Sequence, residues 1–303
     1  MTQLSGRRLD RTASLTAQFN AAQRAAETLR PPNRRLLNDP YARHFVENPL
    51  LRAVLSNACA SDIVLRAIDL AWGGLHAHVA LRVRYSDDAC RAALAAGITQ
   101  VVLLGAGFDT SSLRHATDPV TVYEVDAPAT QADKRAIMED RFRSGPSCHI
   151  VWVPCDFEHD TVRDRLLASG FDRSKASLVI WLGVTPYLTE TAIDATLADL
   201  TNLCALGSRL VVDYIVSGVA SGKTRWKSAS RVARMVARRG EPYRSDFTPD
   251  QFDAVLSAYG FASQEYLTVS ALLQRYDPHN TSRVRGEDWL AVATAERIAS
   301  EPK

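Results

Sequence analysis

The chain has 303 residues, of which 46% are hydrophobic and 23% are charged, a balance typical of globular proteins that excludes disordered and fibrous classes. Its formal net charge of +2 provides no global field for nucleic acid or an anionic membrane, so we expect no nucleic-acid partner. The length allows one large α/β domain with additions or two small domains.

The cysteines and the N-terminal segment indicate a reducing, cytoplasmic location. Five cysteines are scattered without a Cys-x-x-Cys pair, so neither a disulfide framework nor a metal site is expected. The N-terminal arginines precede no apolar signal core, and no stretch has the ~18 apolar residues that a membrane span needs. These cysteines are Cys59, Cys90, Cys148, Cys155 and Cys204.

The first 97 residues carry the apolar spacing of helices. In residues 12–30 apolar side chains recur at three- and four-residue steps until a pair of prolines ends the pattern. Residues 53–81 continue the helical pattern, with a break predicted at Gly73-Gly74. Residues 82–88 then lead into a helix that ends near Gly97.

Residues 101–104 are four consecutive apolar residues, typical of a parallel strand that is buried on both faces. Gly105 follows and is free to adopt backbone angles closed to other residues, while Gly107 leaves room for a ligand against the main chain. Residues 110–112 offer capping hydroxyls for a helix through Arg114, whose free N–H groups would face the crevice. Strand, glycine turn and helix together predict a nucleotide-type cofactor site.

The next strand, residues 121–126, ends in acids that lie 17 and 19 residues after Gly107, near the distance at which a ribose is held. Glu124 and Asp126 share one face of this strand, and Asp126 is nearer its end, so we assign the ribose contact to Asp126. A dinucleotide fingerprint needs a third glycine where Thr110 stands, and no P-loop lysine follows. S-adenosylmethionine, which has a ribose and adenine but no phosphate, fits these residues.

A charged helix and a third strand follow. We expect the helix to present a solvated face, and the strand covers residues 149–157. Asp156 could accept a hydrogen bond from the adenine amino group, while Phe157 offers a main-chain N–H and an aromatic wall. Alternatively, Asp156 caps a helix over residues 160–167. The charged residues of the first helix are Lys134, Arg135, Glu139, Asp140 and Arg141.

The second half of the chain supplies the rest of a doubly wound α/β sheet. Further strands are predicted at 178–181, 208–216, 262–269 and 288–293, with capped helices after Thr189 and Phe247. The result is a seven-stranded, mostly parallel sheet whose last strand is antiparallel.

Residues 223–239 form the most basic segment, with seven lysines and arginines and with Val232, Met235 and Val236 at helical spacing. A basic amphipathic helix could contact a membrane surface or RNA. We favour a lid with a solvated face, because no charge excess elsewhere supports either partner.

Three segments, 101–110, 124–128 followed by Lys134-Arg135, and 181–188, resemble the leucine carboxyl methyltransferase family, which includes bacterial S-adenosylmethionine-dependent O-methyltransferases. The resemblance extends from about Thr12 to Ala293. It implies the class I methyltransferase fold in one domain, residues 1–303. Within that domain it implies an N-terminal helical lid or substrate layer (1–81), a cofactor-binding core (82–216), a basic helical insertion (217–245) and the C-terminal part of the sheet (246–303). From sequence alone, the N-terminal layer could equally be a helical layer on the sheet edge.

The resemblance also bears on single positions. It implies that Arg82 contacts the carboxylate of the cofactor's methionyl part; the alternative is that Arg82 or Arg84 forms a surface ion pair with Asp87 or Asp88. Many relatives carry glutamate where Leu182 stands and arginine where Ser111 stands. Main-chain carbonyls at 181–183 could replace the missing glutamate.

Methyl transfer from a sulfonium to a carboxylate needs no base, because the acceptor is already ionised, whereas a phenol or alcohol would benefit from one. Tyr187, just past the fourth predicted strand, is our candidate for orienting the acceptor; its alternative is a half-buried loop aromatic. We expect the seven histidines, His115 on an outer helix among them, to serve packing or surface roles.

The sequence therefore predicts an S-adenosylmethionine-dependent O-methyltransferase acting on a carboxyl or hydroxyl oxygen of a small-molecule acceptor of secondary-metabolite or fatty-acid type. The predicted cofactor contacts are Arg82, Gly105, Gly107, Asp126, Asp156 and Phe157. Two alternatives remain: a nicotinamide-linked oxidoreductase, and a non-catalytic S-adenosylmethionine-binding regulatory protein. The oligomeric state stays open.

Overall fold

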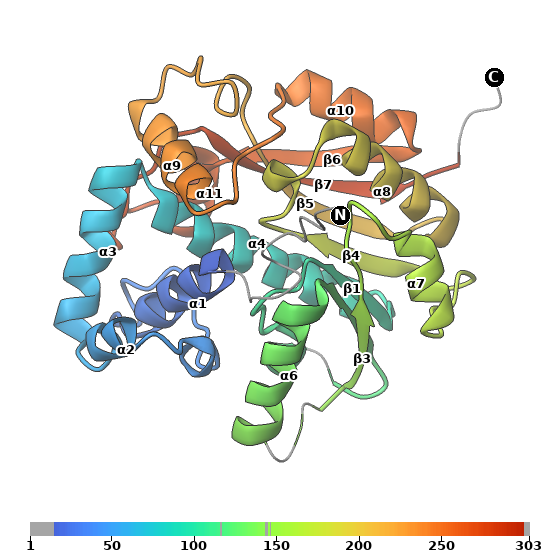
Figure 1. Cartoon of the computed structure of the whole chain (residues 1–303), viewed down its shortest axis with the longest axis horizontal. Helices are drawn as coiled ribbons and strands as arrows, with labels where there is room; N and C mark the ends of the chain where they lie inside the picture. The colour runs from blue at the N-terminus through green and yellow to red at the C-terminus, as the bar shows by residue number, and fades with distance from the viewer. Residues whose placement is uncertain (1–14, 116, 143–144, 146, 300–303) are drawn as a thin grey trace, which may run out of the picture.

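The computed structural model describes residues 15–115, 117–142, 145 and 147–299. Within these residues the centre of the molecule is a seven-stranded sheet with the order β3-β2-β1-β4-β5-β7-β6 (Figure 1). Neighbouring strands are parallel except at β7, which runs antiparallel to both β5 and β6. This confirms the predicted doubly wound α/β architecture. The strands are β1 (Gln100–Leu104), β2 (Thr121–Asp126), β3 (His149–Pro154), β4 (Ser177–Trp181), β5 (Arg209–Ile215), β6 (Phe261–Thr268) and β7 (Leu290–Arg297).

Helices cover both faces of the sheet because its central strands are apolar on both. In β1, Val101 and Leu103 belong to one apolar cluster, while Val102 and Leu104 belong to another, as the alternation of a strand requires. The first cluster is completed by α4 (Leu75–Ala95), α9 (Lys227–Arg238) and α11 (Val269–Tyr276). The second is completed by α7 (Val162–Ala168), α8 (Glu190–Leu203) and α10 (Pro249–Ala258).

The N-terminal helices form a separate layer beside the sheet (Figure 1). Its apolar cluster joins Ala21 and Ala22 to Phe45, Phe108 and Met138. Phe45 stacks on Phe108 with ring centroids 5.6 Å apart, and Phe108 directly follows the glycine turn. The layer therefore packs on the predicted site. Its elements are α1 (Leu15–Thr28), the short 3-10 helix Ala42–Phe45, α2 (Pro49–Leu55) and α3 (Ala58–Trp72); α6 (Pro128–Arg141) supplies Met138.

The break predicted at Gly73-Gly74 is confirmed, because α3 ends at Trp72 and α4 begins at Leu75, after Gly74 in the left-handed region. From there α4 runs without a break through residues 82–88. The helix after the glycine turn, α5 (Ser111–Arg114), is a single turn. Its Thr110 makes no side-chain cap; the Ser111 N–H instead bonds to the Asp109 carboxylate (2.6 Å). Residues 12–14 of the first predicted helix lie outside the described residues.

The strand order reverses between β1 and β4. From β1 the chain proceeds through β2 to β3 on one side, and from β4 through β5 on the other. At such a switch point the loops at the carboxyl ends of the two strands diverge and leave a crevice. Across the described residues, the structure contains no helix with both the length and the apolarity to cross a bilayer.

Candidate functional site

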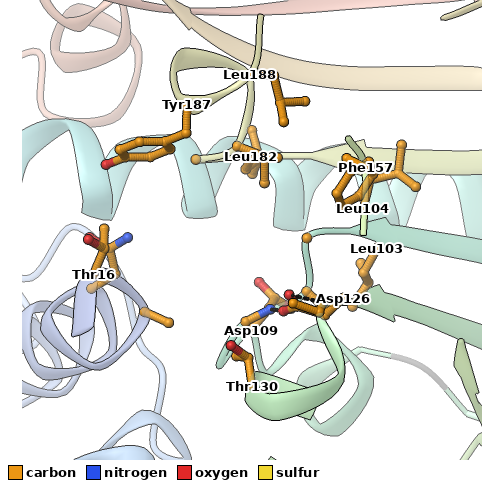
Figure 2. A pocket seen from close by; sticks show the side chains of 18 of the residues that line it. Thr16, Leu103, Leu104, Asp109, Asp126, Thr130, Phe157, Leu182, Tyr187 and Leu188 are labelled. Carbon is orange, nitrogen blue, oxygen red and sulfur yellow. Dashed lines mark hydrogen bonds between the residues drawn. The ribbon is translucent and has the colours of Figure 1, made fainter. Parts of the chain in front are cut away.

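A cavity of about 410 Å³ lies at this switch point, in the size range of small-molecule sites. Its walls come from the ends of β1, β2, β3 and β4 and from α1. Figure 2 shows Asp109, Asp126 and Thr130 on one side and Leu182 and Tyr187 on the opposite side. Thr16 of α1 lies at the left of the view, on the same side as Tyr187. Of the predicted site residues, Arg82, Gly105, Gly107, Asp126, Asp156, Phe157 and Tyr187 all line this cavity.

The glycine turn needs its glycines for two different reasons. Gly105 has φ +66°, and a Cβ there would lie 2.2 Å from Val184 Cγ2, so a side chain would clash with the loop after β4. Gly107 has φ +47°, a backbone conformation that residues with a Cβ rarely adopt. A Cβ there would not clash, because the nearest atom, Ala17 Cβ, would be 3.4 Å away. The N–H groups of Gly105 and Ala106 donate to the Val125 carbonyl at 2.8 and 3.0 Å, which ties the turn to β2.

Asp126 stands at the end of β2 with its carboxylate against this turn. One oxygen accepts a hydrogen bond from the Gly107 N–H and the other from the Ala127 N–H, the latter at 2.6 Å. Burial raises the pKa of Asp126 to about 6, although the two N–H donors oppose this shift. A carboxylate offers about four acceptor positions, so Asp126 retains capacity toward the cavity.

Glu124, the other candidate acid, is buried and forms an ion pair inside the protein. Its carboxylate lies 2.5 Å from Lys134 Nζ and accepts a hydrogen bond from the Ser112 hydroxyl at 3.0 Å. Lys134 was expected on a solvated face, and that prediction is wrong: the residue is 1% exposed. Asp109 and Asp126 also interact electrostatically with this ammonium, so several negative charges offset its burial.

Asp156 and Phe157 follow β3 at the far end of the cavity. Asp156 accepts a hydrogen bond from the Glu158 N–H at 3.0 Å, which closes the turn between β3 and α7. The alternative prediction that Asp156 caps the next helix is wrong, because α7 begins at Val162 and Thr161 occupies its N-cap position. The Phe157 side chain lies beside Leu104 in Figure 2.

Arg82 projects from α4 into the opposite end of the cavity. Its Nη1 donates to the Asp213 carboxylate at 2.6 Å, so the alternative pairing with Asp87 or Asp88 is wrong for this residue. Asp213 also accepts from the Gly183 N–H at 2.6 Å, and His78 Nε2 lies 3.2 Å from it. Burial opposes ionisation of Asp213, but Arg82 and His78 hold its pKa below the usual value.

Leu182 and Gly183 follow β4 and line the cavity beside Arg82. Gly183 has φ +74°, which residues with a Cβ rarely adopt, and a Cβ there would lie 2.8 Å from Arg82 Nη2, so a side chain would also displace the guanidinium. Leu182 lines the cavity and supplies no polar side-chain atom. Ser111, the second departure from the family pattern, is buried, and Arg114 Nη2 donates to its hydroxyl at 3.3 Å. A guanidinium therefore occupies that neighbourhood through Arg114.

Tyr187 ends a short 3-10 turn, Thr185–Tyr187, after β4. Its ring lies against that of Tyr243, with centroids 5.3 Å apart. Burial raises the pKa of Tyr187 to about 12, so its phenol is protonated at neutral pH.

Several residues of the site were not predicted from the sequence. Arg24 of α1 donates to the Phe108 carbonyl (2.5 Å) and to the Asp39 carboxylate (2.9 Å), which holds the segment after the glycine turn. Thr16 donates to the Glu241 carboxylate, and the Arg244 N–H donates to the Pro186 carbonyl at 2.7 Å. These contacts join residues that are 15 to 225 positions apart, so no local sequence pattern indicates the network.

Two of the buried histidines have packing partners, as expected. His76 Nε2 lies 2.8 Å from the Glu27 carboxylate, and His78 contacts Asp213 as described above. His115 follows α5 and lies 3.0 Å from Asp87.

The sequence pattern of the leucine carboxyl methyltransferase family matches residues 17–201. A Mycobacterium marinum protein named "Putative S-adenosyl-L-methionine-dependent methyltransferase" is 35% identical over 229 residues, covering 73% of this chain and 70% of that protein. The Bacillus subtilis protein of the same name, YktD, is 32% identical over 189 residues, covering 62% of each chain. The match to the Bacillus protein thus leaves more than a third of its length uncovered.

Solved structures share the fold at low sequence identity. A Streptomyces avermitilis duf574 family protein superimposes with a TM-score of 0.58 at 16% identity, covering 96% of this chain and all of that one. A Thermobifida fusca protein described as a methyltransferase gives 0.57 at 18% identity, covering 79% and 89%. The matched family pattern, the relatives and the site together place the chain in the leucine carboxyl methyltransferase family of S-adenosylmethionine-dependent methyltransferases.

Proposed function

We propose that this protein transfers the methyl group of S-adenosylmethionine to a carboxyl or hydroxyl oxygen of a small-molecule acceptor. The observation that carries the proposal is that Gly107, Asp126, Arg82 and Tyr187 line one cavity. Figure 2 shows Asp126 and Tyr187 on opposite sides of it. S-adenosylmethionine carries its methyl group on a sulfonium. In an in-line displacement the methyl group moves to the acceptor oxygen, and the sulfur leaves as a neutral thioether. The protein then has to position the two partners and exclude water.

The residues present fit this cofactor. Asp126 offers free acceptor positions to the ribose hydroxyls, and Gly107 lets the ligand approach the main chain. Asp156 and Phe157 stand where the adenine would lie, at the end of β3. Arg82 Nε is buried without a hydrogen-bond partner among the described residues, which suits a guanidinium that receives the methionyl carboxylate. Leu182 offers that end of the ligand only its main chain and an apolar side chain.

The acceptor would lie between Tyr187 and α1. The described residues that line the cavity include three arginines and no histidine; they also include five acids, Asp109, Asp126, Asp156, Glu158 and Glu241. Tyr187, whose phenol keeps its proton, can donate a hydrogen bond to an acceptor oxygen but is a poor general base. We favour a carboxylate acceptor because it needs orientation and no deprotonation; an alcohol would need one of these acids as its base.

Two segments close the cavity and act as its lid in this proposal. Thr16 of α1 is joined to Glu241 by a hydrogen bond, and Arg244 Nη1 lies 3.7 Å from the Glu158 carboxylate on the far rim. The segment 240–244 thereby bridges α1 and the loop after β3. These contacts support the N-terminal layer and residues 217–245 as substrate-covering parts of one domain.

The test is a calorimetric titration with S-adenosylmethionine and NADH, followed by transfer of labelled methyl from S-adenosylmethionine to carboxylic acids and phenols. We expect binding of S-adenosylmethionine alone and incorporation of a base-labile methyl, as for an ester. Binding without transfer to any acceptor would favour the non-catalytic regulatory alternative, and preferential binding of NADH would favour the oxidoreductase.

A further inference from the structure

The basic segment, residues 223–239, differs in charge from the rest of the chain. Residues 223–239 hold seven lysines and arginines and no acid, so the remaining 286 residues carry a net charge of −5. Most of the segment is α9, which buries Val232 and Val236. Lys227, Arg231, Arg234 and Arg238 recur at four-, three- and four-residue steps on its other face, which is exposed. The helix therefore presents a row of positive charge.

A shallow surface groove runs along this row. The described residues that line it are Arg231, Arg234, Met235, Arg238 and Arg239, so its walls carry guanidinium groups and no carboxylate. Clustered guanidinium groups in this arrangement suit phosphate oxygens, which they bind by bidentate hydrogen bonds.

The neighbouring helix α3 carries apolar side chains on its outer face. Ile63 is 68% exposed and Leu70 is 88% exposed, and Ala67, also exposed, lies between them at helical spacing. The opposite face of α3 buries Leu65 and Ile68. A single exposed leucine is ordinary, whereas a stripe at i, i+4 and i+7 on a helix that already buries its other face indicates a second contact surface.

The row and the stripe are adjacent. Arg231 Nη1 donates to the carbonyl of Ala71, next to Leu70, at 2.8 Å. Figure 1 shows α9 beside the carboxyl end of α3. We define the α3–α9 surface as Ile63, Ala67, Leu70, Arg231, Arg234 and Arg238.

We propose that the α3–α9 surface docks on an anionic lipid bilayer. The aliphatic side chains of α3 would enter the boundary between headgroups and acyl chains while the arginines of α9 meet the lipid phosphates. The net negative charge of the rest of the molecule would turn this surface toward the membrane.

Two other occupants fit the surface less well. Single-stranded RNA is bound through aromatic side chains on which bases stack, and the exposed apolar residues of this surface are aliphatic. A second copy of the chain in a two-fold dimer would bring identical arginine rows close together, because each patch faces its own copy.

The surface also borders the route to the proposed site. Met235 and Arg239 line both the groove and a cavity of about 50 Å³. Arg82 and Tyr187 line both that small cavity and the main one. A membrane-held apolar acceptor would therefore meet the protein next to its methyl-transfer cavity, but the docking itself is independent of the proposed function.

The test is co-sedimentation of the full chain with vesicles of phosphatidylcholine alone or with about one third phosphatidylglycerol, at about 0.1 M and about 1 M salt. Arg234→Gln/Arg238→Gln should lower partitioning onto the anionic vesicles by about thirtyfold, which corresponds to about 1 kcal/mol for each arginine. Leu70→Ser should lower it by about tenfold. Circular dichroism checks that each variant is folded.

The matched controls lie at the other end of the molecule in Figure 1, around α7 and α8. Leu206→Ser removes a 61% exposed leucine, and Arg173→Gln/Lys175→Gln removes two exposed charges. Both should bind vesicles like the parent protein. The proposal is overturned by absent binding, by equal binding to neutral vesicles, or by binding that the α3–α9 variants leave unchanged. It is also overturned if these variants abolish only oligoribonucleotide binding or only self-association in sedimentation velocity.

Discussion

The main-chain N–H of Gly107 and the carboxylate of Asp126 form a hydrogen bond that joins the glycine turn after β1 to the end of β2. The two residues are 19 positions apart, and both line the cavity, so their contact places a half-buried acid beside the main chain of the glycine turn. The proposed cofactor site depends on this relationship.

Asp126→Asn should weaken S-adenosylmethionine binding tenfold or more, because hydrogen bonds to a charged carboxylate contribute about 1.5–3 kcal/mol. Asparagine keeps one acceptor, which the Gly107 N–H can use, and loses the acceptor for the Ala127 N–H, so circular dichroism checks that the variant is folded. The dissociation constant by calorimetry is the measurement, with Asp164→Asn on the exposed face of α7 as the control. Equal affinities for the Asp126 variant and the parent protein would remove Asp126 from the ribose contact.

S-adenosylmethionine affinity should depend on pH through the same carboxylate. The pKa of Asp126 is raised to about 6 by burial, so the free protein holds this proton at pH 5 and releases it by pH 7. The ionised form is the better acceptor, so affinity should rise about tenfold between these pH values. In Asp126→Asn this rise should disappear; a variant that retained it would assign the titration to another group.

A side chain at Gly105 should disrupt the turn by collision as well as by backbone strain. Gly105→Ala places a Cβ 2.2 Å from Val184 Cγ2 at φ +66°, and we expect a loss of about 2–4 kcal/mol in the free energy of unfolding.

Gly97→Ala is the control for strain alone, since Gly97 has φ +85° and nothing lies within 4 Å of a Cβ there. Gly97→Ala should lower the free energy of unfolding by about 1–2 kcal/mol. Because Gly105→Ala/Val184→Ala removes the clash, it should lower the free energy of unfolding only by about as much as Gly97→Ala does. Denaturant unfolding measures all three. Equal losses for Gly97→Ala and Gly105→Ala would contradict the close approach of Val184.

Removal of Lys134 should leave the Glu124 carboxylate buried without its counter-charge. We expect Lys134→Met to lower the free energy of unfolding by about 3–5 kcal/mol and Lys134→Met/Glu124→Leu to regain most of it. Arg141→Gln, an exposed change on the same helix, should alter stability by less than about 0.5 kcal/mol. A small effect of Lys134→Met would show that the lysine reaches water.

The local features of the fold and the candidate site could be predicted from the sequence. The apolar run of β1, the positive-φ glycines and the acid at the end of β2 are neighbours along the chain, and the physical demands on each are visible in residue type alone. The mostly parallel character of the sheet could also be predicted, because parallel strands covered by helices are apolar on both faces. The strand order was not predicted.

The parts that could not be predicted depend on contacts between distant segments. Arg82 and Asp213 are 131 residues apart, and nothing near Arg82 distinguishes it from Arg84, which stays exposed beside Asp88. Lys134 sits in a helix rich in charge, and its burial follows only from the position of Glu124 on the neighbouring strand. Arg24 contacts the glycine turn only because α1 packs across it.

The most direct test of the proposed site is the crystal structure of the protein with S-adenosylhomocysteine. We predict that the ribose hydroxyls lie within hydrogen-bonding distance of Asp126, with the amino-acid part directed toward Arg82. A ligand bound elsewhere, or a cavity wall at Asp126 closed by a protein side chain, would contradict it.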